Sequence, residues 1–435
     1  MATKSGKREV MIVGSGGREH AIGWKISQSP LVGRVYFAPG NGGTPDNVDI
    51  MQKDIGGLVA FARGRENMMT IVGPEEPLSL GIVDEFEKEG LRIFGPSAAA
   101  ARIEASKVFA KKFMTEAGIP TAKYGIFTDP ERAREYAAGQ DSPVVVKADG
   151  LAAGKGVIVC DNVDQAIAAI EATMVSKEFG SAGDSIVVEE RISGEEASFI
   201  ALCDGDSIIP LASSQDHKRI FDGDKGPNTG GMGAYSPAPV VTAELHEEIM
   251  KRVMNPAINT MKKRGTPFSG FLYAGIMIDE KNGRPYVLEF NARMGDPECQ
   301  PIMMRMKSDL YEYVDAAVDR RLSSMPPIEW HPQTAVCVVM AARGYPGRYE
   351  KGAVIEGLDS SAQKDLMVFH AGTARDANRN VITNGGRVLG VTALGSTAEE
   401  AADRAYSAVR HIRWGENGHQ YRTDIARRAI VSQRQ

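Results

Sequence analysis

The stretch from Lys147 to Cys160 reads KADGLAAGKGVIVC, and it decides which kind of phosphate-binding fold the chain adopts. A P-loop places four residues between its first Gly and its Gly-Lys pair, and then needs Ser or Thr to hold magnesium. Here three residues separate Gly150 from Gly154, and Gly156 follows the lysine. The sequence therefore excludes a P-loop and leaves two readings: another phosphate-binding geometry, or an ordinary flexible turn.

The flanks of this loop favour a flap. Lys147 ends the apolar run PVVVK, and the run GVIVC follows the loop, so the loop joins two strands as a hairpin does. A P-loop instead runs from a strand into a helix. Small residues between antiparallel strands can close over phosphates and donate their backbone N–H groups. The alternative for Lys147 is a lysine that reaches solvent from a strand end.

The first hundred residues alternate short apolar strands with helical stretches, and a Gly- or Pro-rich turn closes each strand. This rhythm predicts a parallel α/β sheet, in which ligands bind at the carboxyl ends of the strands. The expected strands are 10–13 (closed by GSGG), 35–37 (APGNGG), 70–72 (GPEEPL) and 92–94 (GPS), with a helix over 18–27.

A dinucleotide site is disfavoured at the first turn. The sixth position of G-x-G-x-x-G is Glu19, and the second strand leads to Ala38-Pro39-Gly40 instead of an acidic residue. The turn is either a plain tight turn or a loop whose amides bind a smaller phosphate. Glycines on adjacent strand ends suit the second reading: Gly16, Gly17, Gly40, Gly42 and Gly43.

The rest of the chain changes rhythm. We expect a helix from Ser106, its N-cap, to Gly118, and then a small α+β lobe with antiparallel strands. Strands over 271–279 and 285–293 turn at 281–283, and SSMPPIEWHP (323–332) is typical of a linker. The last segment has strands at 335–340, 367–369 and 387–391, and its helix begins with a capping box from Ser396 to Glu399.

Composition narrows the function. A chain of 435 residues forms two to four domains, and its net charge of -5 gives no reason to expect nucleic-acid binding. No apolar segment approaches the length that spans a bilayer. The four scattered cysteines are typical of free thiols in a reducing compartment. We therefore expect a cytoplasmic protein without nucleic-acid or membrane partners, and a monomer, because no long exposed apolar stretch stands out.

Metal chemistry is indicated by VLEFNAR. Side chains alternate along a strand, so Glu289, Asn291 and Arg293 share one face. A carboxylate and a carboxamide two residues apart present neighbouring hard oxygens, which suits Mg²⁺ that bridges nucleotide phosphates. The alternative is a polar strand face with a surface ion pair. GDPECQP follows directly and favours the metal site.

A nucleotide site is indicated by VVEERISGEEASF (187–199). A segment that leaves a strand can present its backbone to an adenine edge, and a later carboxylate can accept from ribose hydroxyls. Taken alone, these glutamates would more often be solvated. Three signals now fall in a fixed order: the lysine with its glycine flap, this E-E-x-x-x-G-x-E segment, and E-F-N-x-R on a late strand.

That order resembles the ATP-grasp superfamily. Segments in order from about residue 10 to 430 are similar to the signatures of the phosphoribosylamine–glycine ligase family: VGSGGREHA, APGNGGT, IVGPEEPL, IFGPS, KADGLAAGKGV, GEEASF, SQDHKR, GPNTGGMGAYSP, GFLYAGIMID, EFNARMGDPE and TNGGRVL. The resemblance implies an N-terminal α/β domain (1–105), a two-lobed ATP-grasp core (106–326, small lobe about 124–193) and a small C-terminal α+β domain (327–435).

The reaction that the resemblance implies joins glycine to 5-phosphoribosylamine. ATP would activate the glycine carboxylate as glycyl phosphate, and the products would be glycinamide ribonucleotide, ADP and phosphate, the second step of purine synthesis. The alternative within the superfamily is another carboxylate–amine ligase or a carboxylase with a different acceptor. Two rival classes are a dinucleotide oxidoreductase and a non-catalytic nucleotide sensor; the sensor has no need of Glu289, Asn291 and Arg293 together.

The resemblance also assigns residues. Glu289 and Asn291 would bind Mg²⁺ (or Mn²⁺), although Ile278 stands where many ATP-grasp proteins have a further carboxylate, and the number of metal ions stays open. Arg293 and Lys147 would be the catalytic cations. ATP would contact Lys107, Lys147, Gly150, Gly154, Gly156, Glu189, Glu190, Ile192 and Glu196. The acceptor site would use Gly16, Gly17, Gly40, Asn41, Gly42, Asp216, His217, Lys218, Asn228, Gly230, Gly231, Arg293 and Asp296.

Overall fold

The N-terminal part is a four-stranded parallel sheet in the order β2-β1-β3-β4. The computed structural model describes residues 6–151, 156–359, 364–416 and 418–434. Alternate residues of β1 enter different cores, Met11 and Val13 on one side and Val10 and Ile12 on the other, so the strand is an unbroken apolar run. The elements are β1 (Arg8–Gly14), β2 (Val32–Pro39), β3 (Met69–Val72), β4 (Arg92–Phe94), α1 (Gly17–Ile26), α2 (Ile55–Arg63), α3 (Glu75–Ser79), α4 (Ile82–Lys88) and α5 (Ala98–Ala105).

A small lobe follows α6 (Lys107–Glu116), which Ser106 caps through Phe109 N as predicted. Its antiparallel sheet has the order β5-β8-β6-β7. Because β6 pairs antiparallel with β7, the loop between them is a hairpin connection, as the sequence predicts. The elements are β5 (Tyr124–Phe127), β6 (Val144–Ala148), β7 (Val157–Val159), β8 (Ile186–Glu190), α7 (Pro130–Ala138), α8 (Val163–Ile170), the π-helix η1 (Glu171–Val175) and the 3-10 helix η2 (Gly180–Asp184).

The second lobe of the core is the antiparallel sheet β10-β9-β15-β16. Here β15 and β16 form the predicted pair of strands, and the pairing of Gly275 with Glu289 places Glu289 on the β16 edge of the sheet. The elements are β9 (Gly194–Asp204), β10 (Ile208–Pro210), β15 (Ser269–Asp279), β16 (Pro285–Asn291), α9 (Ala243–Ile249), η3 (Met250–Met254), α10 (Asn255–Lys263), α11 (Cys299–Arg305), α12 (Leu310–Val318) and η4 (Leu322–Ser324).

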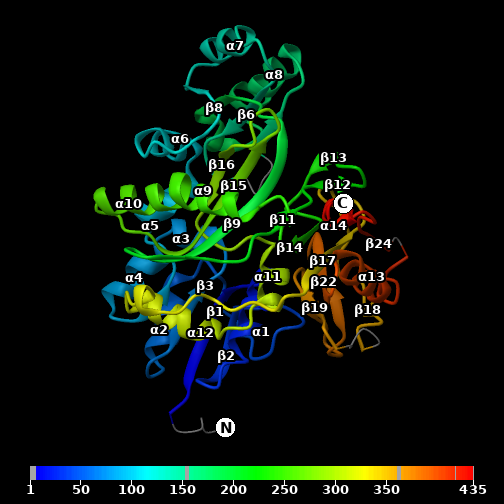
Figure 1. The fold of residues 1–435 in the computed structure, drawn as a ribbon. Coiled ribbons are helices and arrows are strands. Elements are labelled where there is room, and N and C mark those ends of the chain that lie inside the picture. Colours follow the sequence, from blue (N-terminus) through cyan, green and yellow to red (C-terminus); the bar gives the residue numbers. More distant parts are fainter. Residues whose placement is uncertain (1–5, 152–155, 360–363, 417, 435) are drawn as a thin grey trace.

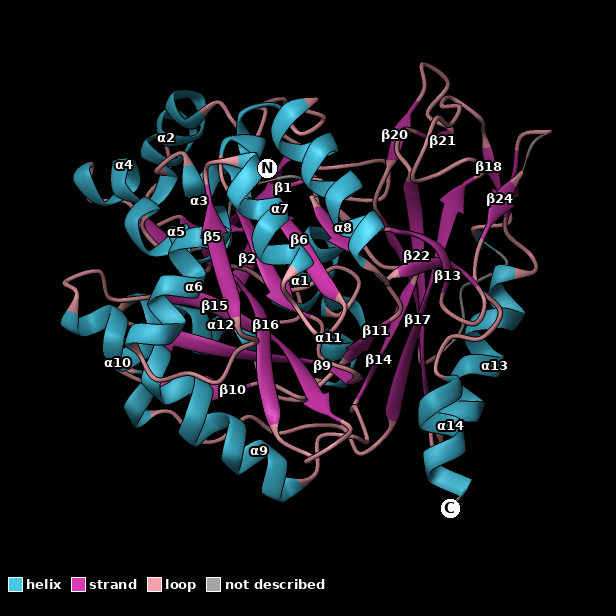
Figure 2. Cartoon of the chain, turned by 90° about the horizontal axis from the view of Figure 1, so that it is seen from above, coloured by secondary structure: helices cyan, strands magenta, loops and turns pink. Residues whose placement is uncertain are grey.

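The C-terminal sheet includes two strands from the middle of the chain, β11 and β14. Its order is β11-β14-β17-β22-β19, and β24 also pairs with β17. Helices α13 and α14 lie to the outer side of this sheet (Figure 2). The elements are β11 (Gln215–Asp216), β14 (Gly233–Ser236), β17 (Thr334–Ala342), β19 (Leu366–His370), β22 (Arg387–Gly395), β24 (His419–Gln420), α13 (Ala398–Val409) and α14 (Arg427–Arg434), with the pairs β12 (Arg219–Phe221) and β13 (Lys225–Asn228), β18 (Ile355–Glu356) and β23 (Arg413–Trp414), and β20 (Thr373–Arg375) and β21 (Val381–Thr383).

The predicted capping box of α13 is wrong by one residue. The N-cap is Thr397, whose side chain accepts from Glu400 N. Glu400 in turn accepts from Ser396 N at 2.7 Å. Because Ser and Thr are adjacent, and Glu occurs at both 399 and 400, the sequence offers two frames, and only the turn geometry selects one.

The lobe with α7 and α8 stands at one end of the molecule and the N-terminal sheet at the other, with the C-terminal sheet beside them (Figure 1). The fold class expected from the sequence is confirmed. Within the ranges that the structure describes, no helix is both long enough and apolar enough to span a membrane.

Two buried histidines join the N- and C-terminal parts. His20 Nδ1 accepts from His370 N at 2.9 Å, and the two ring centroids are 5.7 Å apart. Burial, and secondarily the charge that His370 can carry, lowers the pKa of His20 to about 3. Burial followed by Arg375 lowers the pKa of His370 to about 4. Both side chains are therefore neutral at pH 7.

We expect this contact to weaken the fold in acid. Below the unfolded pKa of about 6.5, the unfolded chain binds protons that native His20 does not, so stability falls as pH drops from 6.5 toward 4. At pH 5 the protonation of His20 in the unfolded chain should by itself lower the free energy of unfolding by about 2 kcal/mol. In His20→Asn, whose Oδ1 can replace Nδ1 as acceptor, the loss in unfolding free energy between pH 7 and pH 5 should be smaller by that amount. An identical loss in both proteins, measured by urea unfolding, would contradict this.

Candidate active site

The predicted metal residues lie where β16 meets α6. Glu289 Oε2 accepts from Lys107 Nζ at 3.0 Å, and Asn291 Oδ1 accepts from Arg293 Nη2 at 3.1 Å. Lys107 is the main reason that the pKa of Glu289 lies well below its usual range, so Glu289 is a carboxylate at neutral pH. Its charge and the Asn291 oxygen fit the hard-ligand preference of Mg²⁺.

The described residues hold no group of three or more His, Cys, Asp or Glu that could bind a metal ion. A metal held by Glu289 and Asn291 would therefore need further oxygens from elsewhere, and Mg²⁺ commonly takes one or two protein ligands together with water and substrate phosphates. The residues fit a metal that arrives with a nucleotide better than a permanently caged ion.

Arg293 is clamped by two N-terminal carboxylates. Its Nη2 lies 2.7 Å from Glu104 Oε1, and its Nε lies 3.3 Å from Glu75 Oε2. Burial alone would lower the pKa of Arg293, but Glu104 and Glu75 outweigh it and raise that pKa. Glu104 also accepts from Ala292 N at 2.7 Å. The guanidinium is thus fixed beside Asn291, and sequence reasoning missed both glutamates.

Lys147 emerges from β6 into a buried ion-pair cluster. Its Nζ lies 2.5 Å from Glu189 Oε1 and donates to Leu288 O at 2.9 Å. A second lysine that the sequence did not single out, Lys111, lies 2.5 Å from Glu189 Oε2. Burial opposes ionisation of Glu189, but Lys147 and Lys111 lower its pKa below the usual value. Both lobes therefore contact Lys147, because Leu288 belongs to β16.

The base of the glycine flap is tied to α6. Asp149 Oδ1 accepts from Ser106 Oγ at 2.8 Å and from Val108 N at 3.1 Å. Gly150 has φ +148, which a side chain would disfavour, and Gly156 O accepts from Ala148 N at 2.8 Å. The predicted contact at Gly154 lies outside the described residues. The first residues of the flap therefore lie next to Lys107, because Asp149 contacts both neighbours of that lysine, Ser106 and Val108.

The expected adenine and ribose residues follow β8. Glu190 N donates to Lys123 O at 2.9 Å, Ile192 is half-buried, and Glu196 forms an ion pair with Lys218. Burial alone would lower the pKa of Lys218, but the charges of Glu196 and then Glu289 outweigh burial and raise that pKa. Lys218 therefore stays protonated. The structure brings the predicted ribose carboxylate and a predicted acceptor lysine into direct contact.

Asp216 and Glu298 form an acidic pair at the acceptor side. Glu298 Oε1 accepts from Ser198 Oγ at 3.0 Å and from Tyr273 OH at 2.7 Å. Asp216 Oδ1 is buried without a hydrogen-bond partner. Burial, followed by the charge of Glu298, raises the pKa of Asp216. Sequence reasoning missed Glu298, although GDPECQP directly after the metal strand contains it.

His217 does not join its neighbours Asp216 and Lys218. Its Nδ1 lies 3.3 Å from Gly233 O, and the ring lines a separate cavity of about 580 Å³ with Tyr235 and Arg422. Burial, followed by Arg422, lowers its pKa to about 4. Successive side chains of an extended segment point to opposite faces, which separates His217 from the other two.

The first glycine turn is filled by Glu19. Glu19 Oε2 accepts from Gly16 N at 2.6 Å, and its Oε1 lies 2.5 Å from Arg18 Nε. A Cβ on Gly14 or Gly73 would lie 2.6 Å or 2.1 Å from the Glu19 side chain. This carboxylate occupies the helix N-terminus that a dinucleotide would use for its pyrophosphate, which agrees with the sequence argument against NAD.

The second glycine turn contacts the C-terminal part. Asn41 Nδ2 donates to Ser15 O and to His370 O, each at 2.9 Å, and Gly42 N donates to Thr373 Oγ1 at 3.1 Å. Gly40 has φ +74 and its N donates to Gly14 O at 3.2 Å. The predicted glycine loops are therefore adjacent, but protein groups already satisfy several of their amides.

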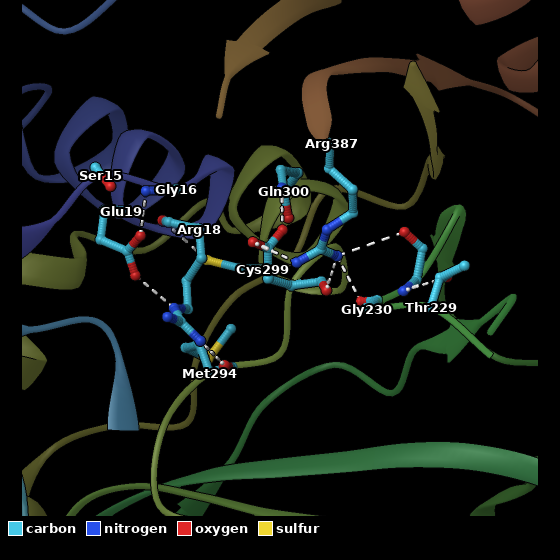
Figure 3. A network of polar contacts seen from close by, with 12 residues as sticks. Ser15, Gly16, Arg18, Glu19, Thr229, Gly230, Met294, Cys299, Gln300 and Arg387 are labelled. Carbon is cyan, nitrogen blue, oxygen red and sulfur yellow. Dashed lines mark hydrogen bonds and ion pairs between the residues drawn. The ribbon is translucent and has the colours of Figure 1, made fainter. Parts of the chain in front are cut away.

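Arg387 contacts both Asp296 and the glycine-rich segment, and Figure 3 shows it beside Gly230. Arg387 Nη1 donates to the carbonyls of Gly230, Gly231 and Asp296, and its Nη2 donates to Asp296 Oδ2 at 3.2 Å. Asn228 ends β13 in the same segment. A Cβ on Gly17 would lie 2.5 Å from Gln300 Nε2, which donates to Asp296 Oδ1 at 2.9 Å.

Three family models cover most of the chain in order. They describe the N domain, the ATP-grasp (A) domain and the C domain of phosphoribosylglycinamide synthetase, and they match residues 8–104, 105–299 and 335–428. A curated phosphoribosylamine–glycine ligase from Vibrio vulnificus (strain YJ016) is 52% identical over 431 residues, which is 98% of this chain and 99% of that protein. The chain belongs to the phosphoribosylglycinamide synthetase family.

Other relatives support this family assignment. A ligase of the same name from Allochromatium vinosum is 54% identical and covers 98% of this chain and 100% of its own. The crystal structure of phosphoribosylamine–glycine ligase from Thermotoga maritima has a TM-score of 0.83 at 34% identity, over 96% and 99% of the two chains. The biotin carboxylase domain of Hydrogenobacter thermophilus 2-oxoglutarate carboxylase has a TM-score of 0.69 at 18% identity over 95% and 91%, which shows a shared fold alone.

Proposed function

We propose that the chain joins glycine to 5-phosphoribosylamine at the expense of ATP. The products are glycinamide ribonucleotide, ADP and phosphate, in purine synthesis. The observation that carries the proposal is the end-to-end match to ligases of that name. The geometry supports it, because Glu289, Asn291 and Arg293 share one face, where Lys107 contacts Glu289 and the buried Glu104 contacts Arg293.

The chemistry needs no protein nucleophile. A carboxylate oxygen of glycine attacks the terminal phosphorus of ATP, and the bond to the bridging oxygen breaks as ADP leaves. The amine nitrogen of phosphoribosylamine then attacks the carbonyl carbon of glycyl phosphate, phosphate leaves, and the nitrogen loses one proton. The protein has to align the reactants, stabilise charge and exclude water.

The cations around β16 supply the charge stabilisation. We assign Lys107 and Lys147 the role of neutralising phosphate oxygens, and Arg293 that of stabilising the phosphoryl group and the later tetrahedral oxyanion. The contacts of Lys107 with Glu289 and of Lys147 with Glu189 support this assignment. Mg²⁺ or Mn²⁺ held by Glu289 and Asn291 would neutralise and orient the phosphates. We assign the flap between β6 and β7 the role of a lid over the phosphates, because it joins two antiparallel strands.

The enzyme is proposed to work in the cytoplasm as a monomer. All four cysteines are free and buried, which suits a reducing compartment. The large apolar side chains that the described residues expose, such as Leu31, Met51 and Phe221, come from separate segments of the sequence.

Isotope transfer tests the mechanism. With ¹⁸O in the glycine carboxylate, one labelled oxygen should appear in the released phosphate, because that oxygen forms the P–O bond of glycyl phosphate and leaves with phosphorus. Activation as an adenylate would send that oxygen to AMP. Phosphorylation of the amine would give unlabelled phosphate, because the carboxylate oxygen expelled on amide formation would then leave as water. Mass spectrometry of the phosphate decides. Release of ADP should also require both glycine and phosphoribosylamine, and unlabelled phosphate would overturn the acyl-phosphate route.

A further inference from the structure

The segment TNGGRVL (383–389), which the proposed mechanism does not use, contacts the central part of the chain through Arg387. The contacts of Arg387 with Gly230, Gly231 and Asp296 are called the brace below. In the segment, Gly385 and Gly386 leave no room for side chains: a Cβ on Gly385 would lie 2.7 Å from Gly372 Cα, and one on Gly386 would lie 2.3 Å from the Tyr345 ring. This tight turn delivers Arg387 at the start of β22, within the C-terminal sheet.

The guanidinium of Arg387 binds several protein acceptors. Its Nη1 donates to three backbone carbonyls, those of Gly230, Gly231 and Asp296, and its Nη2 donates to Asp296 Oδ2 at 3.2 Å. The side chain is 22% exposed. Figure 3 shows Arg387 reaching from its own strand to the segment of Thr229 and Gly230. A group engaged in this way holds the loops that it contacts in a fixed arrangement.

The two loops that Arg387 holds carry acceptor-side residues. Gly231 has φ +111, and a Cβ there would lie 2.7 Å from Asp216 Oδ1, so its backbone is packed against the unpartnered carboxylate oxygen. Asp296 follows Arg293 by three residues and contacts Gln300, which abuts Gly17. A second contact comes from Tyr345, whose hydroxyl accepts from Gly230 N at 3.0 Å.

We propose that Arg387 is a positioning residue for phosphoribosylamine: by fixing Gly230, Gly231 and Asp296 it shapes the acceptor half of the site. This inference rests on the proposed function. The nucleotide residues Lys107, Lys147 and Glu289 have their own partners and do not contact Arg387. Loss of the brace should therefore weaken use of the phosphoribosylamine substrate selectively.

The planar fork explains why lysine is a poor substitute. Three carbonyls and a carboxylate converge on one guanidinium, which offers several N–H donors in a fixed plane, whereas an ammonium group is a compact point charge. We expect Arg387→Met to raise the KM for phosphoribosylamine at least about tenfold and Arg387→Lys to raise it by less, because losing hydrogen bonds to a charged group costs on this scale. Tyr345→Phe should raise the same KM by only about two- to threefold.

Steady-state kinetics on the full chain, with each substrate varied in turn, tests this assignment. The KM for ATP should change less than about twofold, and Arg413→Met is the matched control, because that arginine is 79% exposed and pairs with Glu356 on the surface. Thermal melting of each variant excludes a general loss of structure; if Arg387→Met does not fold, Arg387→Lys and Tyr345→Phe give the same readout.

Two results would overturn the proposal: an unchanged KM for phosphoribosylamine in folded Arg387→Met, or an equal rise in the KM for ATP. Either is distinguishable from failure of the proposed function, in which the unmodified chain itself would form no ADP from ATP, glycine and phosphoribosylamine.

Discussion

Arg293→Ala should reduce turnover by about 10²-fold or more, the scale for removing one preorganised charge stabiliser. The same change should lower the free energy of unfolding by about 3 kcal/mol or more, because it leaves the buried carboxylate of Glu104 without its cation. Glu104 is only 5% exposed at its side chain, and its Oε1 lies 2.7 Å from Arg293 Nη2. Affinity for ATP should change much less, since Arg293 contacts neither Lys107 nor Lys147.

The double variant Arg293→Ala/Glu104→Gln separates the two effects. A glutamine at 104 retains an oxygen for Ala292 N, which Glu104 Oε2 accepts at 2.7 Å, and it removes the unpaired charge. We expect the double variant to recover at least about 1 kcal/mol of stability, while turnover stays about 10²-fold low. Chemical denaturation and single-turnover kinetics measure the two quantities. Near-normal turnover in folded Arg293→Ala would refute the catalytic assignment.

Much of the local geometry of the candidate site was predictable, because many of its residues lie on regular strands. Alternation along β16 put Glu289 and Asn291 on one face, and the structure places Phe290 in the opposite core. The apolar run before Lys147 predicted a buried strand, and β6 is buried along its whole length. Capping chemistry likewise placed the start of α6 at Ser106, which brings Lys107 to Glu289.

The remaining residues come from contacts that no local pattern encodes. Glu75 and Glu104 reach Arg293 from α3 and α5, and Lys111 reaches Glu189 from α6. The residues of each pair are separated by tens to hundreds of positions in the sequence. The local sequence around a helical glutamate does not show whether its side chain is solvated or buried. Only the packing of three sheets decides which of them face the site.

Irregular backbone limited prediction in the acceptor region. The resemblance assigned Asp216, His217 and Lys218 together to the acceptor site, but β11 is a two-residue strand whose extension turns His217 to the opposite side. In the same way β14, from the middle of the chain, pairs with β17 in the C-terminal sheet. Such non-local pairing depends on tertiary contacts that outweigh local propensity.

Glu289→Gln should reduce turnover by at least about 10²-fold, because the variant loses the charged ligand of the metal that we propose to orient the phosphates. Glu289 also offsets three cations: Lys107 at 3.0 Å, and Lys218 and Lys147, which act with Lys107 to lower the pKa of Glu289. Without the carboxylate these ammonium groups would repel a divalent ion. Calorimetric titration of Mn²⁺ in the presence of ATP should therefore show weaker binding in parallel with the lost turnover.

Two control variants should lose less activity than Glu289→Gln. Asn291→Asp keeps an oxygen beside Arg293 Nη2, so its loss of turnover should stay within about tenfold. Glu356→Gln removes a surface carboxylate that is 62% exposed and paired with Arg413, and it should change neither turnover nor Mn²⁺ binding. Normal turnover of Glu289→Gln at saturating Mg²⁺ would show that Glu289 is not a ligand.

The ligand role and the neutralising role of Glu289 can also be separated. If Glu289 acts only by offsetting Lys107, then removing both charges in Lys107→Met/Glu289→Gln should restore Mn²⁺ affinity. If Glu289 is a metal ligand, the double variant should still bind Mn²⁺ weakly. We expect the second result, because a glutamine at 289 no longer offers the metal an anionic oxygen, whichever of the neighbouring cations is removed. Binding of Mn²⁺ is the decisive readout, since Lys107 is itself proposed to contact ATP and the double variant should turn over slowly in either case.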